Sequence, residues 1–530
     1  MSSKRKGLIP DKILLPDTRI CSRAMLFNSY EFIVVFLPLC LLCFHLASKH
    51  VGITGAAWML VVASLAFYAS WKPPYVFLIL TSIGFNYSVG RILIGSGRNE
   101  KRRTLLLWFG ITVNIAVLGY FKYWGFIKST LPTFFDIDYN IHSIILPLAI
   151  SFFTFTQIAY LVDCRKGNIK KCTLVEYCFF VLFFPHLIAG PIVRHSEIIP
   201  QVNRLGGGLS IPNLAVGMTV FAFGLFKKVC LADPIGAHAS RLFAEIQGGF
   251  MPDLTHAWGT ALCYTCQLYF DFSGYSDMAI GLGLLFGVKM PLNFDSPYKA
   301  DSIIDFWRRW HISLSRFLKD FIYIPLGGSR RGEVRRYVNL FLTMLIGGIW
   351  HGAGWLFLIW GALHGGYLII NHLWRTVCGK FGSLRILVPG WAGKVLTMVA
   401  VVFGWVVFRS PDEATLWMTV SGMLGLNGIV LPQSVAGLPG IGNLLAGARI
   451  GNSGLGASAC LWLAVLLPIV FFAPNTQQIM YRVKPALQGP ASPSSVSWKA
   501  TWPWALGSGC ALLYAFLSLS NVSEFIYFQF

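Results

Sequence analysis

The chain has 530 residues, of which 55% are apolar and only 12% are charged. Soluble domains carry about 25% charged residues, so this composition excludes an ordinary soluble domain and indicates a polytopic membrane protein. The formal net charge of +21 would suit nucleic-acid binding in a soluble protein, but no helix-turn-helix, zinc-finger or RNA-binding signature accompanies it. We therefore predict no nucleic-acid partner.

Residues 1–24 are polar and basic, and the first apolar run opens directly after them, at Met25. Basic loops follow the third and fifth apolar runs, and Lys and Arg collect on the cytoplasmic side of membrane proteins. This places residue 25 outside the cytoplasm. The basic segment 1–24 would then also lie outside, which conflicts with the preference of basic segments for the cytoplasmic side. Translation from Met25, or a span count wrong by one, would remove the conflict. We predict a basic extension at 1–24 and one membrane domain at 25–530.

Apolar runs recur along the whole chain, each near the length that a helix needs to cross about 30 Å of hydrocarbon. Several contain Gly or Pro, which is compatible with broken or re-entrant helices. We predict an all-α, polytopic integral membrane protein with roughly ten or more transmembrane or re-entrant helices. The runs lie near residues 32–47, 52–70, 75–90, 104–121, 143–162, 177–193, 211–226, 254–270, 338–371, 395–408, 458–473 and 500–520.

The 12 cysteines include two C-x-x-C pairs, Cys40/Cys43 and Cys263/Cys266. Four thiolates could in principle hold a zinc ion. Both pairs lie in apolar runs rather than in a polar loop, where cysteine is a common small buried residue. We predict no metal site.

Carboxylates interrupt the apolar pattern in the segment Gln267–Asp277, which reads QLYFDFSGYSD. Asp271 and Asp277 could bind a substrate or pair with an arginine from a loop. Asp277 could also cap a helix that begins near it. The sequence leaves these alternatives open.

The most polar internal stretch is 294–337, and from Lys299 to Arg336 it holds nine basic and four acidic residues. The positive-inside rule predicts that this stretch is cytoplasmic. Apolar residues recur at three- and four-residue steps across 301–321, which predicts one amphipathic helix. His311, in the pair Trp310-His311, falls on its apolar face. A lone histidine in that position is usually a hydrogen-bonded core residue.

A second pair, Trp350-His351, lies in a stretch that has no Asp, Glu, Lys or Arg from Val338 to Trp374. As one helix this stretch would be about 55 Å long, beyond the bilayer core, so it must break, turn or tilt. Four glycines between residues 347 and 354 predict the break around His351. Broken helices at membrane depth pack in protein or line watery cavities. We therefore expect His351 to line an internal cavity and to serve as a general base.

Long segments of the chain resemble the membrane-bound O-acyltransferases, and within them the bacterial alginate O-acetylation branch, which is related to the teichoic acid D-alanyl transferases. The resemblance covers about 25–530 and does not include 1–24. The matching segments are MLFNSYEF at Met25, ISFFTFTQIAYLVD at Ile150, FPHLIAGPIVR at Phe184, QLYFDFSGYSDMAIGLG at Gln267, FWRRWHISLSRFLKDFIYIPLGG at Phe306 and GGIWHGAGWLFLIWGALHG at Gly347.

The resemblance implies a helical fold around a central funnel and tunnel, with His351 as the catalytic residue and His311 as a second catalytic position. We expect Trp310, Trp350, Asp271 and Gln267 to contribute to substrate binding. The implied reaction moves an acetyl group from a cytoplasmic thioester, such as acetyl-CoA, to hydroxyls of an exported polysaccharide, alginate first. His351 would deprotonate the hydroxyl. His311 would orient it or polarise the thioester carbonyl.

The resemblance also implies a multi-pass protein of the bacterial inner membrane, no permanently bound cofactor, contact with membrane lipid, and periplasmic acetyltransferase partner proteins. The acetyl group could pass to such a partner rather than directly to the sugar. Two alternatives stay open. One is acylation of another cell-surface polymer, such as cellulose or teichoic acid. The other is a non-catalytic acyl transporter or scaffold, against which the presence of both histidines argues.

Overall fold

The computed structural model describes residues 25–97, 99–135, 144–380, 389–431, 449–450, 454–519 and 525–526. Within them the predicted all-α fold is confirmed, because regular structure is helical apart from a two-residue parallel pairing of β1 (Val430–Leu431) with β2 (Arg449–Ile450). The segment 1–24, predicted to be a basic extension, lies outside the described residues.

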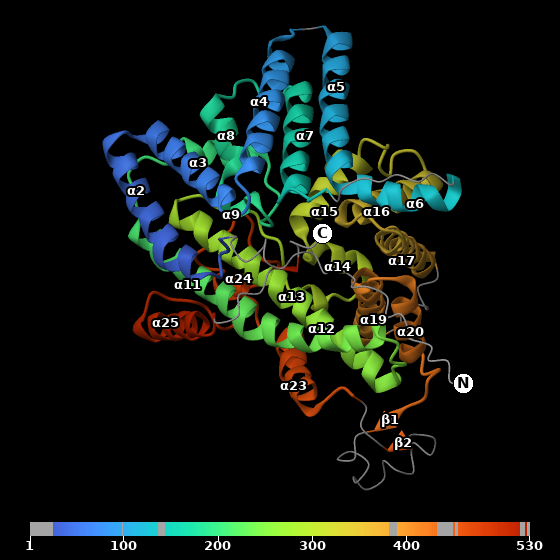
Figure 1. Ribbon diagram of the computed structural model, residues 1–530. Helices are drawn as coiled ribbons and strands as arrows, with labels where there is room; N and C mark the ends of the chain where they lie inside the picture. Colours follow the sequence, from blue (N-terminus) through green and yellow to red (C-terminus); the bar gives the residue numbers. More distant parts are fainter. Residues whose placement is uncertain are drawn as a thin grey trace, which may run out of the picture.

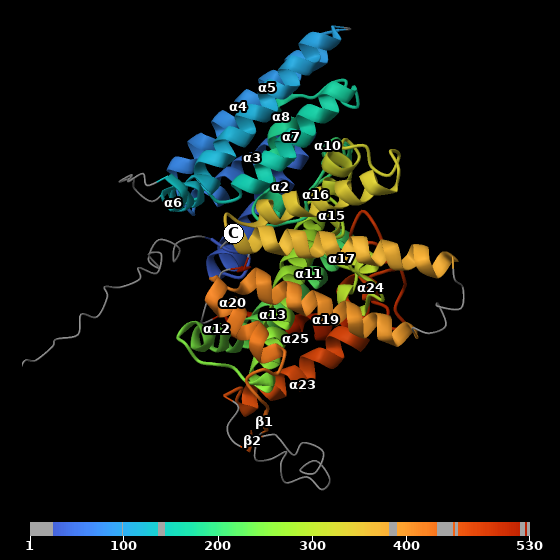
Figure 2. The ribbon, with the colours of Figure 1, turned by 90° about the vertical axis from the view of Figure 1, so that its right-hand side faces the viewer.

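The first part of the chain forms the upper group of helices in Figure 1. Helices α4, α5 and α7 run alongside one another there, α3 lies beside α4, and α2 packs on α3 (Figures 1 and 2). The helices are α2 (Leu37–His50), α3 (Ile53–Ala69), α4 (Pro74–Gly95), α5 (Glu100–Leu118), α6 (Trp124–Phe135), α7 (Ile150–Lys166), α8 (Leu174–Leu182), α9 (Phe184–Leu187) and α10 (His195–Val202). Single π-helical turns precede α2 (Glu31–Phe36) and α6 (Gly119–Tyr123).

The remaining helices pack around α13, which occupies the centre of the molecule (Figure 1). They are α11 (Ile211–Phe226), α12 (Asp233–Gln247), α13 (Leu254–Leu285), α14 (Ile303–Arg309), α15 (Ile312–Leu318), α16 (Glu333–His351), α17 (Trp355–Lys380), α19 (Gly390–Arg409), α20 (Glu413–Met423), α23 (Ala457–Phe472), α24 (Thr476–Ile479) and α25 (Trp502–Leu517). π-Helical turns join α11 to α12 (Lys227–Ala232) and follow α15 (Lys319–Tyr323), and a 3-10 turn lies at Pro297–Lys299.

Six helical segments of the described chain are long and apolar enough to cross a membrane, which makes this a multi-pass membrane protein. They are Glu31–His50, Pro74–Gly95, Glu100–Thr130, Ile211–Gln247, Trp355–Lys380 and Gly390–Arg409. Three shorter apolar helices, Ile53–Ala69, Ala457–Phe472 and Trp502–Leu517, add to this set. The expected total of ten or more crossings stays a prediction, as does the central funnel.

Glycine pairs bring the backbones of α11 and α13 into direct contact. A Cβ atom on Gly281 would lie 2.6 Å from the carbonyl oxygen of Gly217, and one on Gly224 would lie 2.6 Å from that of Gly274. Small residues at such a spacing allow helices to approach closely and gain van der Waals contact where no hydrophobic force acts between them. This contact fixes the central helix, on which Gln267 and Asp271 are carried.

Both carboxylates of the segment Gln267–Asp277 lie inside α13 and are neutralised by consecutive lysines of the turn between α11 and α12. Asp271 accepts from Lys228 at 2.6 Å, and Asp277 accepts from Lys227 at 2.7 Å. The reading of Asp277 as a helix cap is wrong, because the helix runs unbroken for 32 residues and its cap is Asp253. A buried charge must be paired, and partners about 43 and 50 positions away supply this pairing.

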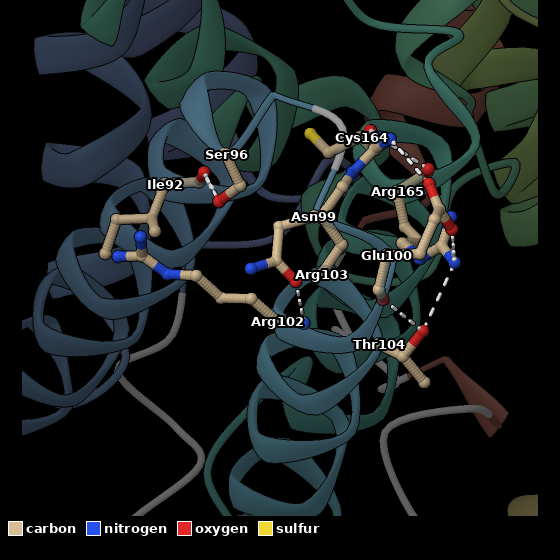
Figure 3. Close-up of polar contacts among 9 residues, drawn as sticks. All are labelled: Ile92, Ser96, Asn99, Glu100, Arg102, Arg103, Thr104, Cys164 and Arg165. Carbon is tan, nitrogen blue, oxygen red and sulfur yellow. Dashed lines mark hydrogen bonds and ion pairs between the residues drawn. The ribbon is translucent and has the colours of Figure 1, made fainter.

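Basic loops from distant parts of the sequence meet at one end of the molecule. Glu100 pairs with Arg165, and Arg103 donates to the carbonyl oxygens of Cys164 and Arg165, which ties the start of α5 to the end of α7 (Figure 3). The next residue, Lys166, lies over the ring of Phe321.

Two further ion pairs at this same end join α10 and the residue before it to α15 and the turn that follows α15. Arg194 pairs with Asp320, and Arg316 pairs with Glu197. Arg194 also lies over the ring of Phe321, which links this group to Lys166. We call this end of the molecule the basic end; it holds the start of α5, the end of α7, the start of α10, and α15 with the turn that follows it.

Candidate functional site

The uncharged stretch 338–374 breaks where its glycines predicted. Helix α16 ends at His351, Gly352 is extended (φ −160°, ψ 157°), and α17 begins at Trp355. The two helices fold back against each other so closely that a Cβ atom on Gly361 would lie 2.6 Å from the carbonyl oxygen of Met344. His351 therefore sits at the tight turn of a helical hairpin.

Aromatic rings enclose the His351 imidazole, and its residue is only 4% exposed. The ring centroids of Trp350 and Trp360 each lie 5.0 Å from that of His351, and the Phe408 centroid lies at 5.3 Å. Burial among rings excludes water from the imidazole and favours its neutral form, the form that can accept a proton.

Lys122 holds the end of α16 from the π-helical turn before α6. Its ammonium donates to the carbonyl oxygens of Trp350 at 2.6 Å and His351 at 3.2 Å, and to the hydroxyl of Ser151 at 3.2 Å. The last carbonyl oxygens of a helix lack hydrogen-bond partners within the helix and bear the partial negative charge of the helix dipole. An ammonium group there supplies the missing hydrogen bonds and offsets that charge. Lys122 thus fixes the backbone from which the His351 imidazole projects.

The stretch 301–321 is not one helix, and that prediction is wrong. Helix α14 ends at Arg309, α15 starts at Ile312, and His311 between them has left-handed backbone angles (φ 43°, ψ 55°). L-residues rarely adopt this region, and such strain recurs at functional sites where the surroundings enforce it. The expected burial is confirmed, since His311 is 0% exposed. Burial lowers the pKa of His311 to about 3, so its imidazole is neutral.

Asn293 enforces the conformation at His311. Its main-chain oxygen accepts from the backbone N–H of Ile312 at 3.0 Å, and its side-chain oxygen accepts from the N–H and the hydroxyl of Ser313 at 3.2 and 2.6 Å. The same Oδ1 atom lies 3.4 Å from Nδ1 of His311. A backbone N–H can only donate, so this atom of Asn293 is an acceptor. A hydrogen bond to it puts the His311 proton on Nδ1 and leaves a lone pair on Nε2.

The structure brings the two histidines together around the Trp350 indole. The ring centroid of His311 lies 6.4 Å from that of Trp350, and that of His351 lies 5.0 Å from it. Trp310 turns to a different cluster, where its ring packs against Phe294 and Trp405 with centroid distances of 5.0 and 4.8 Å. Of the two tryptophans predicted to bind substrate, Trp350 therefore contacts both histidines, whereas Trp310 packs in the neighbouring cluster.

A cavity of about 960 Å³ opens beside this cluster, between α12, α13 and the end of α19. Gln267 lines it, together with Phe357, Phe408 and Arg409. His351 is not among the described lining residues, which departs from the expectation; Phe408 stands between its imidazole and the cavity. Asp271 does not line it either, because its carboxylate is taken by Lys228 and by the backbone N–H of Ile526.

Sequence reasoning missed Lys122 and Asn293, although each carried a weak signal. Lys122 follows directly on the apolar run 104–121 and is flanked by aromatic residues, a costly arrangement for a lysine that by default suggests function. Asn293 lies 18 positions before His311, in the sequence PLNFDSP. Nothing local shows which distant groups these side chains would hold.

Comparison with known proteins gives a consistent result. The sequence model of the membrane-bound O-acyltransferase family matches residues 101–408. The chain is 38% identical to a peptidoglycan O-acetyltransferase of Helicobacter pylori over 96% of this chain and 98% of that protein. It is 40% identical to a probable alginate O-acetylase of Pseudomonas aeruginosa over 75% of each chain. It is 31% identical to a teichoic acid D-alanyltransferase of Streptococcus thermophilus over 43% of this chain and 57% of that one.

Proposed function

Because the chain belongs to the membrane-bound O-acyltransferase family and is an acyltransferase, we propose that it acetylates hydroxyls of a polysaccharide outside the cytoplasmic membrane. The observation that carries the proposal is the placing of His311 and His351 around one indole at a broken helical hairpin. Two neutral imidazoles in a dry aromatic cluster suit proton removal from a weak acid such as a sugar hydroxyl.

In the proposed step, His351 takes the proton as the hydroxyl oxygen attacks the carbonyl carbon of an acetyl thioester. The new C–O bond forms, the C–S bond breaks, and the leaving thiolate receives the proton from His351, which yields an O-acetyl ester and a free thiol. His311 presents a lone pair at Nε2 if Nδ1 donates to Asn293. This favours orientation of the hydroxyl by His311 over polarisation of the thioester carbonyl, which would need a donor.

The donor in this proposal is acetyl-CoA or a similar thioester that approaches from the basic end, and the membrane is the bacterial inner membrane. Positive charge on the cytoplasmic side and the anionic phosphates of CoA both support this direction. Alginate is the first acceptor to test, and the peptidoglycan and teichoic acid relatives make other envelope polymers the alternatives. Periplasmic acetyltransferase proteins would receive or deliver the acetyl group on the far side.

The test replaces His351 by alanine in cells that lack the native protein. Acetylation of the polymer should fall below detection while the protein stays at wild-type abundance, because a general base contributes about 10²–10⁴-fold to the rate. His311→Ala should lower acetylation severely, though less. Polymer acetyl content and a membrane immunoblot are measured side by side.

His50→Ala serves as the matched control, because His50 is an exposed histidine at the end of α2. It should leave acetylation unchanged. Normal acetylation at normal abundance in the His351 variant would refute the base role.

A further inference from the structure

The cavity of about 960 Å³ lies at the His351 end of α16, roughly 23 Å along that helix from Arg335 and Arg336 near its start. It has the size of the larger small-molecule sites. Phe408, whose ring packs on His351, is in its wall. A molecule in the cavity would therefore be one aromatic ring away from the proposed base.

Arg409, the residue after Phe408, is half-buried in the wall of this cavity and is held by stacking rather than by charge. Its guanidinium carbon lies 5.2 Å from the ring centroid of Phe243 and 5.9 Å from that of Tyr264. Among the described residues it forms no ion pair, whereas Lys228 in the same wall is bound to both Asp233 and Asp271. Stacking keeps the planar guanidinium in place while its donors stay available to a ligand.

Two uncharged groups beside Arg409 also lack partners among the described residues. Tyr264 and Gln267 are one turn apart on α13, so their side chains share a face of that helix. The buried hydroxyl of Tyr264 and the buried amide oxygen of Gln267 accept or donate no hydrogen bond there. Buried polar atoms are normally satisfied, and a hydroxylated ligand would supply the missing bonds.

We propose that this cavity is the acceptor subsite and that Arg409 binds a carboxylate of the acceptor, which makes the preferred substrate an acidic saccharide. The inference rests on the proposed function and adds Arg409 as the residue that selects an acidic acceptor over a neutral one. The carboxylate pairs with the guanidinium in the two-pronged geometry that arginine offers. Sugar hydroxyls bond Gln267 and Tyr264, and the aromatic rings of Trp462 and Tyr514 in the same wall cover the apolar faces of the sugar.

The test is equilibrium binding to the full-length protein in lipid nanodiscs. The probes are a fluorescently labelled tetrasaccharide of a uronic acid and the same tetrasaccharide with its carboxyl groups reduced to alcohols. The wild type should bind the acidic probe about tenfold or more tightly, as a charge-assisted pair predicts. Arg409→Gln should bind both probes equally, and Arg409→Lys should fall between, because lysine keeps the charge and loses the planar fork.

Arg241→Gln is the control, since Arg241 is an exposed arginine of α12 that pairs with Glu245 and does not line the cavity. It should keep the wild-type preference. Equal binding of both probes by the wild type, or an unchanged preference in Arg409→Gln, would overturn the inference. So would displacement of the acidic probe by a tetrapeptide rich in aspartate at lower concentration, because the ligand would then be a protein.

Saccharide binding and acetyl transfer are measured separately, so that failure of this inference can be told from failure of the proposed function. Acetyl transfer by the wild type without carboxylate preference would refute only the acceptor class. Arg409-dependent binding without any acetyl transfer would instead refute the proposed function.

Discussion

The side-chain oxygen of Asn293 is the point on which the geometry of His311 depends, because it meets Ser313 and His311 at once. Asn293→Leu keeps the volume and removes this acceptor. The variant should lose about ten- to a hundredfold in acetyl transfer, because the left-handed turn at His311 would relax and misplace its imidazole. Asn293→Asp keeps an acceptor oxygen and should retain more activity. Transfer rates of purified protein in nanodiscs measure both.

A buried asparagine elsewhere separates positioning from general damage. Asn86 bonds Asn114 between α4 and α5, away from the histidines. Asn86→Leu should lower thermal stability and leave the rate per folded molecule unchanged. Wild-type turnover in Asn293→Leu would count against the positioning role.

Residue types in the site were predictable, whereas their partners were not. His351 stood out because a titratable residue in an uncharged, glycine-broken stretch is costly. His311 was placed correctly in the interior by its spacing from apolar neighbours. Its left-handed turn was missed because it depends on Asn293, 18 positions earlier. Lys227 and Lys228 likewise meet their carboxylates only once α11 and α13 have packed.

At the scale of helices, the contact between α11 and α13 should tolerate no added carbon. Gly281→Ala puts a Cβ atom 2.6 Å from the carbonyl oxygen of Gly217, so the helices must separate. Overpacking of this kind costs about 1–3 kcal/mol. We expect a thermal midpoint several degrees lower, measured by tryptophan fluorescence in detergent.

The matched control, Gly84→Ala, should change the thermal stability in the opposite direction. Gly84 lies on α4, and no atom of the described residues lies within 4 Å of an added Cβ. Alanine is a better helix former than glycine by about 1 kcal/mol, so Gly84→Ala should be neutral or stabilising. A midpoint for Gly281→Ala as high as that for Gly84→Ala would show that the close contact is not required.

The break between α16 and α17 is marked by a local sequence signal, whereas the break between α14 and α15 is not. The hairpin between α16 and α17 was foreseen because its glycines are a local signal and the stretch was too long for the bilayer. The break at Trp310-His311 has no glycine or proline, and the apolar spacing continues across it. The continuity of α13 was missed because a local signal was misleading. Asp277 is a residue type that commonly caps helices, but it lies inside the helix and its carboxylate pairs with Lys227.

For the whole molecule, the clustering of basic loops at one end supports a cytoplasmic position for that end. Ser329 is exposed there, between α15 and α16. A single cysteine at Ser329 in a cysteine-free background should react with a membrane-permeant maleimide. It should resist an impermeant one added outside intact spheroplasts.

The control site is Met251, which is 55% exposed and precedes α13. The far end of α13 leads to Lys289, whose backbone bonds the Gln201 side chain of α10, so Met251 lies at the opposite end of α13 from the basic end. A cysteine there should react with the impermeant reagent. Outside labelling at Ser329 would invert the topology and remove the argument for a donor at the basic end.

The pairing of Asp271 and Asp277 with Lys228 and Lys227 also bears on how the protein is made. A ribosome releases α11 and its lysines before α13 emerges, and α13 is not among the segments apolar enough to cross a membrane by composition. Its two carboxylates would be expensive in lipid until they meet those lysines. We expect α13 to enter the bilayer only together with α11 in an in vitro translation and insertion assay. Insertion of α13 alone would contradict this expectation. If α13 inserts only with α11, then Lys227 and Lys228 assist the membrane insertion of a later helix of the same chain.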